Sequence, residues 1–469
     1  MAALPADTLF QTVRELGDRL RRREVTSVQL TELALDRLST IGKDLNAVAT
    51  LTPELARAQA KRADDERKHG KDKGPLHGIP YGAKDLLDTK GIRTTWGAKP
   101  FEKRVPDSNA TVISKLEAAG AVLCAKLSMA ELAGGLGYHR GNASLQGPMR
   151  NPWNRERWAG GSSSGTGAAI GAGLVPFGIG TETWGSILCP SNFCGVTGLR
   201  PTYGRVSRHG AMALSWTLDK IGPMGRTLDD TRLVLDAIAG PDPLDAASAN
   251  AKLDWRGVTR GNLKGLRAAH VVSDFAKNGE PETGKAYDAA LQALRAAGLD
   301  IVEAKLPDLP YEATAIVALQ AEVIEAFRGL YTSGDVRKLV DERAPIQAEL
   351  AKAITASDYV HAQRLRLQAQ RAMNEFFKDY DLIVSAGFLK IAPGVTEDMD
   401  TYFSGADPVG GMGNLTGVPM AALPMGAGKM GMPVGFQLVA PAFDEALLVR
   451  VGNEYQRRTK WHLERPATV

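Results

Sequence analysis

The sequence has few cysteines and no long hydrophobic run. Its 469 residues include only three cysteines, Cys124, Cys189 and Cys194. Three are too few for a disulfide scaffold, so we expect a reducing compartment. No apolar stretch approaches the roughly 18–20 residues of a membrane-spanning helix, and the first residues lack the basic and apolar regions of a secretory signal. We therefore expect a cytoplasmic protein with no membrane contact.

The sequence also lacks an excess of charge of one sign and the usual metal-binding motifs. Lys and Arg number 57 against 53 Asp and Glu, which gives a formal net charge of +4. This near balance does not call for a nucleic-acid partner. The seven histidines are scattered, and neither H-E-x-x-H nor a paired C-x-x-C is present. We expect no metal and no cofactor.

The chain changes in pattern along its length. Apolar residues at helical spacing predict an N-terminal helical layer over residues 7–66. Between residues 75 and 225, short apolar segments alternate with Gly-rich turns, which is typical of an α/β sheet with functional residues at strand ends. Residues 280–380 are predicted to be mostly helical, and strand-like segments follow them. We interpret residues 1–469 as one domain, in which 75–225 is the catalytic core and 280–380 an inserted helical region.

Two serine-bearing turns, residues 160–167 and 180–186, are the most informative feature of the chain. Upstream of them, Lys84 ends a strand-like segment. Serines in tight turns beside free backbone N–H groups suit nucleophilic attack on a carbonyl carbon. A lysine can serve as the base only when it is neutral, which requires burial or a nearby positive charge. The pattern favours a serine hydrolase assisted by a lysine.

Other chemistries fit these turns less well. Residues 161–165 match G-x-S-x-G with Ser163 as nucleophile, but the preceding residues are polar and unlike a buried strand. A phosphate-binding loop would need a lysine after the glycines, and none follows. A thiol nucleophile at Cys189 or Cys194 stays open, although both cysteines suit small buried positions. The segment 399–414 is predicted to be a Gly-rich loop, either a lid over a site or a plain surface connection.

The ordered phrases of the chain resemble the amidase signature family over nearly its whole length, most densely from 75 to 225. These phrases are residues 78–85, 160–163, 185–187, 193–206, 218–224 and 414–419. The resemblance implies an α/β amidase signature fold, in which helices cover both sides of a large mixed β-sheet. It further implies a Ser–cisSer–Lys triad, with Ser186 as nucleophile, Ser162 as the bridging serine at a cis peptide, and Lys84 as base.

By the same resemblance, backbone N–H groups form an oxyanion hole and two side chains support the network. The expected oxyanion-hole residues are Thr183, Trp184, Gly185 and Ser186. The expected supporting residues are Ser163 and Glu182, and Glu182 stands where the family usually has Asp. The expected substrate-binding residues, by rough position, are Met129, Leu132, Gly134, Gly135, Tyr138, Trp184 and Leu188.

Two departures from the family pattern bear on the substrate. Trp184 replaces a glycine, and Leu188 replaces an arginine that serves carboxylate-bearing or polar substrates in some relatives. Since both changes are apolar, we expect an amidase for neutral hydrophobic or aryl amides and anilides, with carbamates (urethanes) or esters as further substrates. Its acyl group would be carried on Ser186. The expected partner is a small-molecule substrate without nucleic acid, and family habit allows a homodimer.

Two other functions remain as alternatives. The first is the glutaminase (A) subunit of a tRNA-dependent amidotransferase, which shares this family and works with partner subunits and tRNA. Residues 202–208 resemble that branch, whereas Trp184 and Leu188 argue against it. The second is a catalytically silent binding protein on the same scaffold, which the presence of Lys84, Ser162 and Ser186 disfavours.

Overall fold

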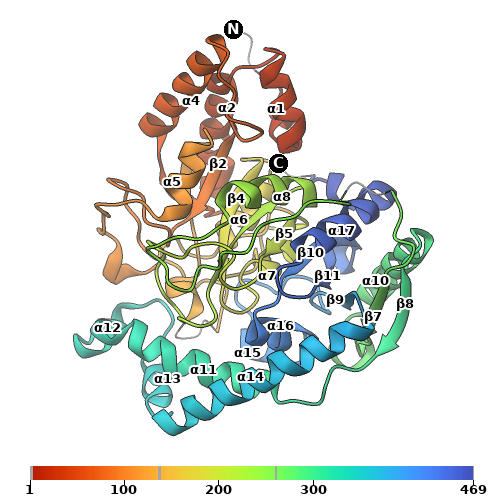
Figure 1. Cartoon of the computed structure of the whole chain (residues 1–469). Helices are drawn as coiled ribbons and strands as arrows, with labels where there is room; N and C mark the ends of the chain where they lie inside the picture. Colours follow the sequence, from red (N-terminus) through yellow and green to blue (C-terminus); the bar gives the residue numbers. More distant parts are fainter. Residues whose placement is uncertain (1–3, 136–138, 259–260, 468–469) are drawn as a thin grey trace.

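A single eleven-stranded mixed sheet forms the centre of the computed structural model, which describes residues 4–135, 139–258 and 261–467 (Figure 1). The strand order is β1-β3-β2-β4-β6-β5-β10-β11-β9-β7-β8. The strands are β1 (Val48–Leu51), β2 (Pro80–Lys84), β3 (Val122–Leu127), β4 (Phe177–Glu182), β5 (Thr197–Arg200), β6 (Lys220–Gly225), β7 (Arg267–Val271), β8 (Asp300–Ala304), β9 (Leu382–Ala386), β10 (Met420–Ala427) and β11 (Pro433–Val439). The α/β fold expected from the sequence is confirmed.

Helices surround the sheet. The α-helices are α1 (Val13–Arg21), α2 (Ser27–Ser39), α3 (Ile41–Asp44), α4 (Pro53–Lys68), α5 (Thr111–Ala118), α6 (Ser164–Gly171), α7 (Leu188–Cys194), α8 (Leu228–Ile238), α9 (Phe275–Asn278), α10 (Pro281–Ala296), α11 (Tyr311–Ala326), α12 (Arg328–Thr332), α13 (Ala344–Ala351), α14 (Ala356–Asp379), α15 (Met399–Phe403), α16 (Gly410–Thr416) and α17 (Glu445–Thr459). None of the helices in the described ranges is both long and apolar enough to span a bilayer.

Local sequence signals explain where several of these helices begin. Thr12, Thr26, Thr227 and Thr355 each accept a hydrogen bond from the backbone N–H three residues later, and the side chain there bonds back to the threonine N–H. Such capping boxes satisfy two helix-terminal donors that would otherwise be unpaired. The N-terminal helical layer predicted over 7–66 therefore has defined starts at two of its helices, although it also contains strand β1.

The central strands are buried on both faces, which is why they carry small and apolar residues throughout. All residues of β2, β4, β5, β6, β9 and β11 are buried. Helices α6 and α7 pack on each other and on central strands, while α8 and α10 pack on α17. Two further groups lie at opposite ends of the molecule in Figure 1, with α1, α2 and α4 at the top and α11, α13 and α14 at the bottom.

Parallel and antiparallel pairings divide the sheet. Strand β2 runs parallel to both β3 and β4, and β7 runs parallel to β8 and β9. Strands β6, β5, β10 and β11 are joined by antiparallel pairs. The parallel pairing of β2 with β4 brings their carboxyl ends to the same edge, and functional residues gather at such edges. Lys84 ends β2 there, and the serine turn of residues 183–186 follows β4.

Candidate active site

Lys84 and Ser162 meet inside the protein. The Lys84 Nζ donates to Ser162 Oγ at 2.8 Å and to Thr181 Oγ1 at 2.9 Å, with a longer contact to the Thr181 carbonyl at 3.3 Å. Both Lys84 and Ser162 are fully buried. Burial lowers the pKa of Lys84 to about 7, although Asp219 and Glu182 oppose the shift. A lysine in this setting is half neutral near neutral pH and can accept a proton.

The two serine turns are joined through the backbone. The peptide bond between Gly161 and Ser162 is cis, as the family resemblance implies. The Ser163 N–H donates to the Ser186 carbonyl at 3.2 Å, and the Ala130 N–H donates to the Ser162 carbonyl at 3.2 Å. A Cβ atom on Gly161 would lie 2.5 Å from the Trp158 ring, so only glycine fits beside it.

The turn that carries Ser186 presents unused backbone donors. Gly185 has a φ of 74°, which favours glycine at this position. In the part of the chain that the structure describes, no hydrogen bond uses the N–H groups of the four expected oxyanion-hole residues, Thr183, Trp184, Gly185 and Ser186. The next two N–H groups, of Ile187 and Leu188, donate to Glu182 Oε2 at 2.8 and 3.0 Å. The turn can therefore offer donors to an oxygen that gains negative charge.

Glu182 belongs to a buried charged network behind this turn. Its Oε1 accepts from Arg200 Nη1 at 3.1 Å. Arg200 also donates to Asn414 Oδ1 at 2.8 Å, and Lys220 Nζ donates to the same oxygen at 3.1 Å. Burial alone would raise the pKa of the Glu182 carboxyl, but Arg200, Lys220 and the two N–H groups together bring it below its usual range. Glu182 is thus an ionised brace for the turn.

Ser163 braces the lysine side of the site. Its Oγ donates to the Thr181 carbonyl at 3.1 Å and accepts from the Thr181 N–H at 3.3 Å. Thr181 in turn contacts Lys84 through its hydroxyl. The hydroxyl of Thr183 donates to Asp219 Oδ1 at 2.6 Å. These contacts hold both ends of the segment that leads from β4 to Ser186.

A cavity of about 520 Å³ opens beside the turn. Its lining combines apolar side chains with three acidic ones, Glu312, Asp400 and Asp407. The other lining residues are Gly134, Gly161, Trp184, Gly185, Cys189, Ile316, Phe388, Met399, Phe403, Ser404 and Gly405. Burial and the nearby Glu182 raise the pKa of Asp407 to about 7. The cavity is large enough for a small amide substrate, and the charged groups among its described lining residues are all acidic.

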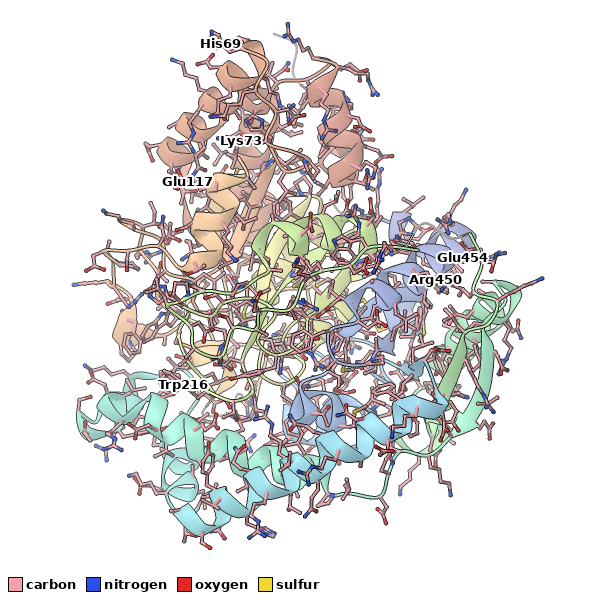
Figure 2. All side chains as sticks on the ribbon, viewed as in Figure 1. His69, Lys73, Glu117, Trp216, Arg450 and Glu454 are labelled. Atoms are coloured by element: carbon pink, nitrogen blue, oxygen red, sulfur yellow. The ribbon has the colours of Figure 1, made fainter. Side chains whose placement is uncertain are left out.

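A second cavity, of about 230 Å³, includes Thr181, Thr183 and Lys220 in its lining. Trp216, which is 70% exposed, also lines it and is labelled in Figure 2 near the group of helices α11, α13 and α14. The neighbouring Ser215 Oγ donates to Glu322 of α11. The segment between β5 and β6 is therefore anchored to helix α11.

The structure scatters the expected substrate-binding residues. Gly134 and Trp184 line the larger cavity. Met129, Leu132 and Leu188 instead lie in the hydrophobic core, each at most 1% exposed. A Cβ atom on Gly135 would meet Leu214 and Phe327, and Tyr138 falls outside the described residues. Contact of these side chains with substrate stays a prediction.

Several residues of the site are not evident from the sequence. Thr181, Arg200, Lys220, Asn414 and Asp407 have no predicted role, although three of them lie in the family phrases. The sequence does hold a signal for two of these residues, because Arg200 and Lys220 are charged residues in largely apolar strand segments. The segment 399–414, predicted to be a loop, contains α15 and α16 instead. Met399 and Phe403 of α15 line the larger cavity, and Asn414 of α16 joins the network.

Comparison with known proteins identifies relatives along nearly the whole chain. The amidase family model matches residues 29–449. The chain is 37% identical over 483 residues to the A subunit of glutamyl-tRNA(Gln) amidotransferase from Roseiflexus sp., covering 97% of this chain and 98% of that protein. The crystal structure of the corresponding subunit from Thermotoga maritima has a TM-score of 0.82 at 28% identity, with 98% and 96% of the chains covered. The peptide amidase of Stenotrophomonas maltophilia has a TM-score of 0.82 at 28% identity, with 97% and 98% covered.

These relatives correct two expectations. The expected stand-alone amidase for neutral hydrophobic or aryl substrates is wrong, because the full-length relatives are the A subunits of an amidotransferase. The expectation of a small-molecule partner without nucleic acid is wrong for the same reason, since that enzyme is named for a tRNA substrate. The structure supplies a physical reason: Leu188, whose apolar side chain is expected to shape the pocket, lies in the core and not in the cavity lining.

The hydrolase chemistry expected from the serine turns and the lysine agrees with this comparison. The family match spans most of the chain, and the relatives cover nearly all of it. The chain therefore belongs to the amidase (amidase signature) family and is an enzyme that hydrolyses amide C–N bonds.

Proposed function

We propose that this protein is the glutaminase (A) subunit of a tRNA-dependent amidotransferase. In this function it hydrolyses the side-chain amide of glutamine, and partner subunits use the released ammonia on an aminoacyl-tRNA. The observation that carries the proposal is the 37% identity to such subunits along 97% of the chain. The match covers 97% of this chain and 98% of that subunit, so it extends over nearly the whole length of both proteins.

We assign the proton relay to Lys84, Ser162 and Ser186. Neutral Lys84 takes a proton from Ser162, which takes the proton of Ser186 as its Oγ attacks the amide carbon. The 2.8 Å contact between Lys84 Nζ and Ser162 Oγ supports the first transfer. The relay then runs in reverse and delivers the proton to the leaving nitrogen, so that the C–N bond breaks and ammonia departs.

Water completes the cycle. It attacks the ester between Ser186 and the glutamyl group, its proton passes into the same relay, and glutamate leaves with Ser186 restored. In both steps the carbonyl oxygen gains negative charge, and the N–H groups of Thr183, Trp184, Gly185 and Ser186 are the proposed donors to it. Loss of one such donor costs roughly 3–4 kcal/mol in other acyl-transfer enzymes.

The charges of the larger cavity suit glutamine. Glu312, Asp400 and Asp407 line it, and no lysine or arginine is among its lining residues in the described chain. A free amino acid carries an α-ammonium group, which carboxylates can bind through charge-assisted hydrogen bonds. Asp400 already pairs with Arg343 at 2.9 Å, and the pKa of Asp407 is about 7. A neutral aryl amide has no cationic group to pair with the acidic side chains. This lining supports a substrate with a cationic end.

The test measures ammonia release by the purified chain, alone and with the partner subunits of such an amidotransferase. We expect glutamine to be hydrolysed, the rate to rise with the complete complex and aminoacyl-tRNA, and Ser186→Ala to abolish turnover. Ser164→Ala is the matched control, since this neighbouring buried serine has no assigned role. Turnover of aryl amides with no hydrolysis of glutamine in any assembly would contradict the proposal.

A further inference from the structure

One peptide group links the buried network to the oxyanion turn. The Thr183 carbonyl and the Trp184 N–H belong to the same planar unit, so that fixing one fixes the direction of the other. Lys220 Nζ donates to the Thr183 carbonyl at 3.3 Å. Within the described residues, the Trp184 N–H is one of the four unused donors of the turn. Lys220 therefore contacts the opposite edge of a group that is proposed to bind the reacting oxygen.

Lys220 is held firmly enough to act on that group. It is 2% exposed at the first position of β6, and its second acceptor is Asn414 Oδ1 at 3.1 Å. Asn414 is fixed by Arg200, and its own Nδ2 donates to the Gly410 carbonyl at 2.9 Å. The lysine thus bridges helix α16 and the turn.

The rest of the turn is held without Lys220. The Thr183 side chain bonds to Asp219, and Glu182 accepts from Ile187 and Leu188. Within the described ranges, the Thr183 carbonyl accepts a hydrogen bond from Lys220 alone. Burying a lysine is costly, and an apolar side chain in β6 would avoid that cost. The position of Lys220 is explained if the turn needs a donor at this carbonyl.

We propose that Lys220 is a positioning residue that, through the Thr183 carbonyl, aims and polarises the Trp184 N–H toward the oxyanion. A donor on the carbonyl strengthens the N–H of the same peptide group, because hydrogen bonds in a chain polarise one another. The effect is greatest when the substrate oxygen is charged, so it acts on the transition state more than on bound substrate. The inference rests on the proposed acyl transfer at Ser186.

The first experiment compares Lys220→Met with Lys220→Arg. Methionine keeps most of the buried volume but has no donor, so we expect kcat to fall about 10- to 100-fold with KM within about threefold. Arginine restores a donor, and the second cavity beside Lys220 leaves room for it. We expect Lys220→Arg to recover most of kcat.

Arg226→Met is the matched control. Arg226, like Lys220, is a buried basic residue that donates to backbone carbonyls, and its acceptors are those of His462 and Glu464 at 3.0 and 2.9 Å, outside the site. We expect this variant to lose thermal stability while the folded enzyme keeps its kcat. If Lys220→Met merely lowers the folded fraction in the same way, with kcat per folded enzyme unchanged, the proposal is wrong.

A transition-state analogue gives a second, independent readout. The probe is 2-amino-4-boronobutanoic acid, in which boron replaces the amide carbon of glutamine and forms a tetrahedral adduct with a serine. Lys220→Met should weaken its inhibition by the same factor as kcat/KM, and equal inhibition of both enzymes would overturn the inference. If the wild type hydrolyses another primary amide but not glutamine, the proposed function fails, and the kcat comparison on that amide still decides the role of Lys220.

Discussion

The backbone N–H of Ser163 donates to the carbonyl of Ser186 at 3.2 Å. This bond joins the loop of the bridging serine to the loop of the proposed nucleophile without using either reactive hydroxyl. Both Ser162 and Ser186 are consequently positioned by backbone contacts, and their side chains stay available for proton transfer. Substituting a neighbouring side chain should therefore lower the catalytic rate partially and not abolish it.

Activity should follow the ionisation of Lys84. With a pKa of about 7, Lys84 is protonated below neutrality and cannot accept a proton. We expect kcat/KM for amide hydrolysis to rise tenfold per pH unit below about 7 and to level off above it. Lys84→Met should lower kcat by at least about 10³-fold and flatten this profile. A wild-type profile that is flat between pH 5.5 and 8 would contradict the role of Lys84 as base.

The same lysine should make stability depend on pH. Its pKa is about 7 in the folded protein and 10.5 in the unfolded chain. Between these values the unfolded chain binds more protons, so the free energy of unfolding increases with pH. Relative to Lys84→Met, we expect the wild type to gain about 3–5 kcal/mol from pH 7 to pH 10.5. Urea denaturation of both proteins at several pH values measures the difference, and parallel curves would refute it.

Glu182 and Arg200 should behave as a coupled buried pair. Both side chains are fully buried and lie 3.1 Å apart. Removing one charge leaves the other uncompensated, which costs about 3–5 kcal/mol in comparable pairs. We expect Glu182→Gln to lower stability by this amount and to reduce kcat, because the turn loses its ionised brace. The double variant Glu182→Gln/Arg200→Met should be destabilised by less than the sum of the single variants, whereas strict additivity would show that the pair is not coupled.

Asp407 should contribute to recognition of the α-ammonium group. At pH 8, above the Asp407 pKa of about 7, the carboxyl is mostly ionised. Under this condition we expect Asp407→Asn to raise KM for glutamine about tenfold or more, because the neutral amide loses the charge-assisted hydrogen bond. The comparison substrate is 5-amino-5-oxopentanoic acid, which lacks the α-amino group of glutamine. The wild type should prefer glutamine, and the variant should hydrolyse both with similar kcat/KM. An unchanged preference in the variant would exclude this role for Asp407.

Removing the Ser163 hydroxyl should loosen Lys84 indirectly. Ser163→Ala removes the 3.1 Å donor to the buried Thr181 carbonyl, which keeps the longer 3.3 Å contact from Lys84. Loss of a hydrogen bond costs about 0.5–1.5 kcal/mol, and we expect a corresponding loss in the free energy of unfolding. Because Thr181 contacts Lys84, kcat should fall about tenfold while KM changes little. A larger effect on KM than on kcat would show that Ser163 acts on substrate binding instead.

Local pattern in the sequence predicts part of the fold. Short apolar segments bounded by glycines mark β2, β3, β4, β9 and β11, and Thr26 precedes a helical stripe as a cap should. The strand order cannot be predicted in this way, because β10 lies between β5 and β11 through contacts far apart in the sequence. Strand β1 lies within a helical pattern and is missed for the same reason. Pairing along a sheet edge overrides local preference.

The candidate site is predicted unevenly. Family phrases lead to Lys84, Ser162 and Ser186, and the structure brings Lys84 to Ser162. Gly134 and Trp184 of the pocket are predicted, but its other walls come from α11, α15 and the segment around Asp407, which lie far from the serine turns in sequence. Leu188 is expected to line the pocket because it lies close to the nucleophile in sequence, but its side chain packs into the core. Proximity along the chain does not decide which side of a turn a side chain occupies.

The hydrogen bond between Arg200 and Asn414 has a consequence for when the site can assemble during synthesis of the chain. Arg200 contacts Gly413, Asn414 and Val418, and β5 pairs with β10, so the turn at 183–186 depends on residues beyond position 410. A ribosome has translated both serines and the lysine long before these partners leave its exit tunnel. We therefore expect the nascent chain to carry every proposed catalytic group in an unassembled state, and hydrolysis to begin only once β10 has paired with β5 in the middle of the sheet.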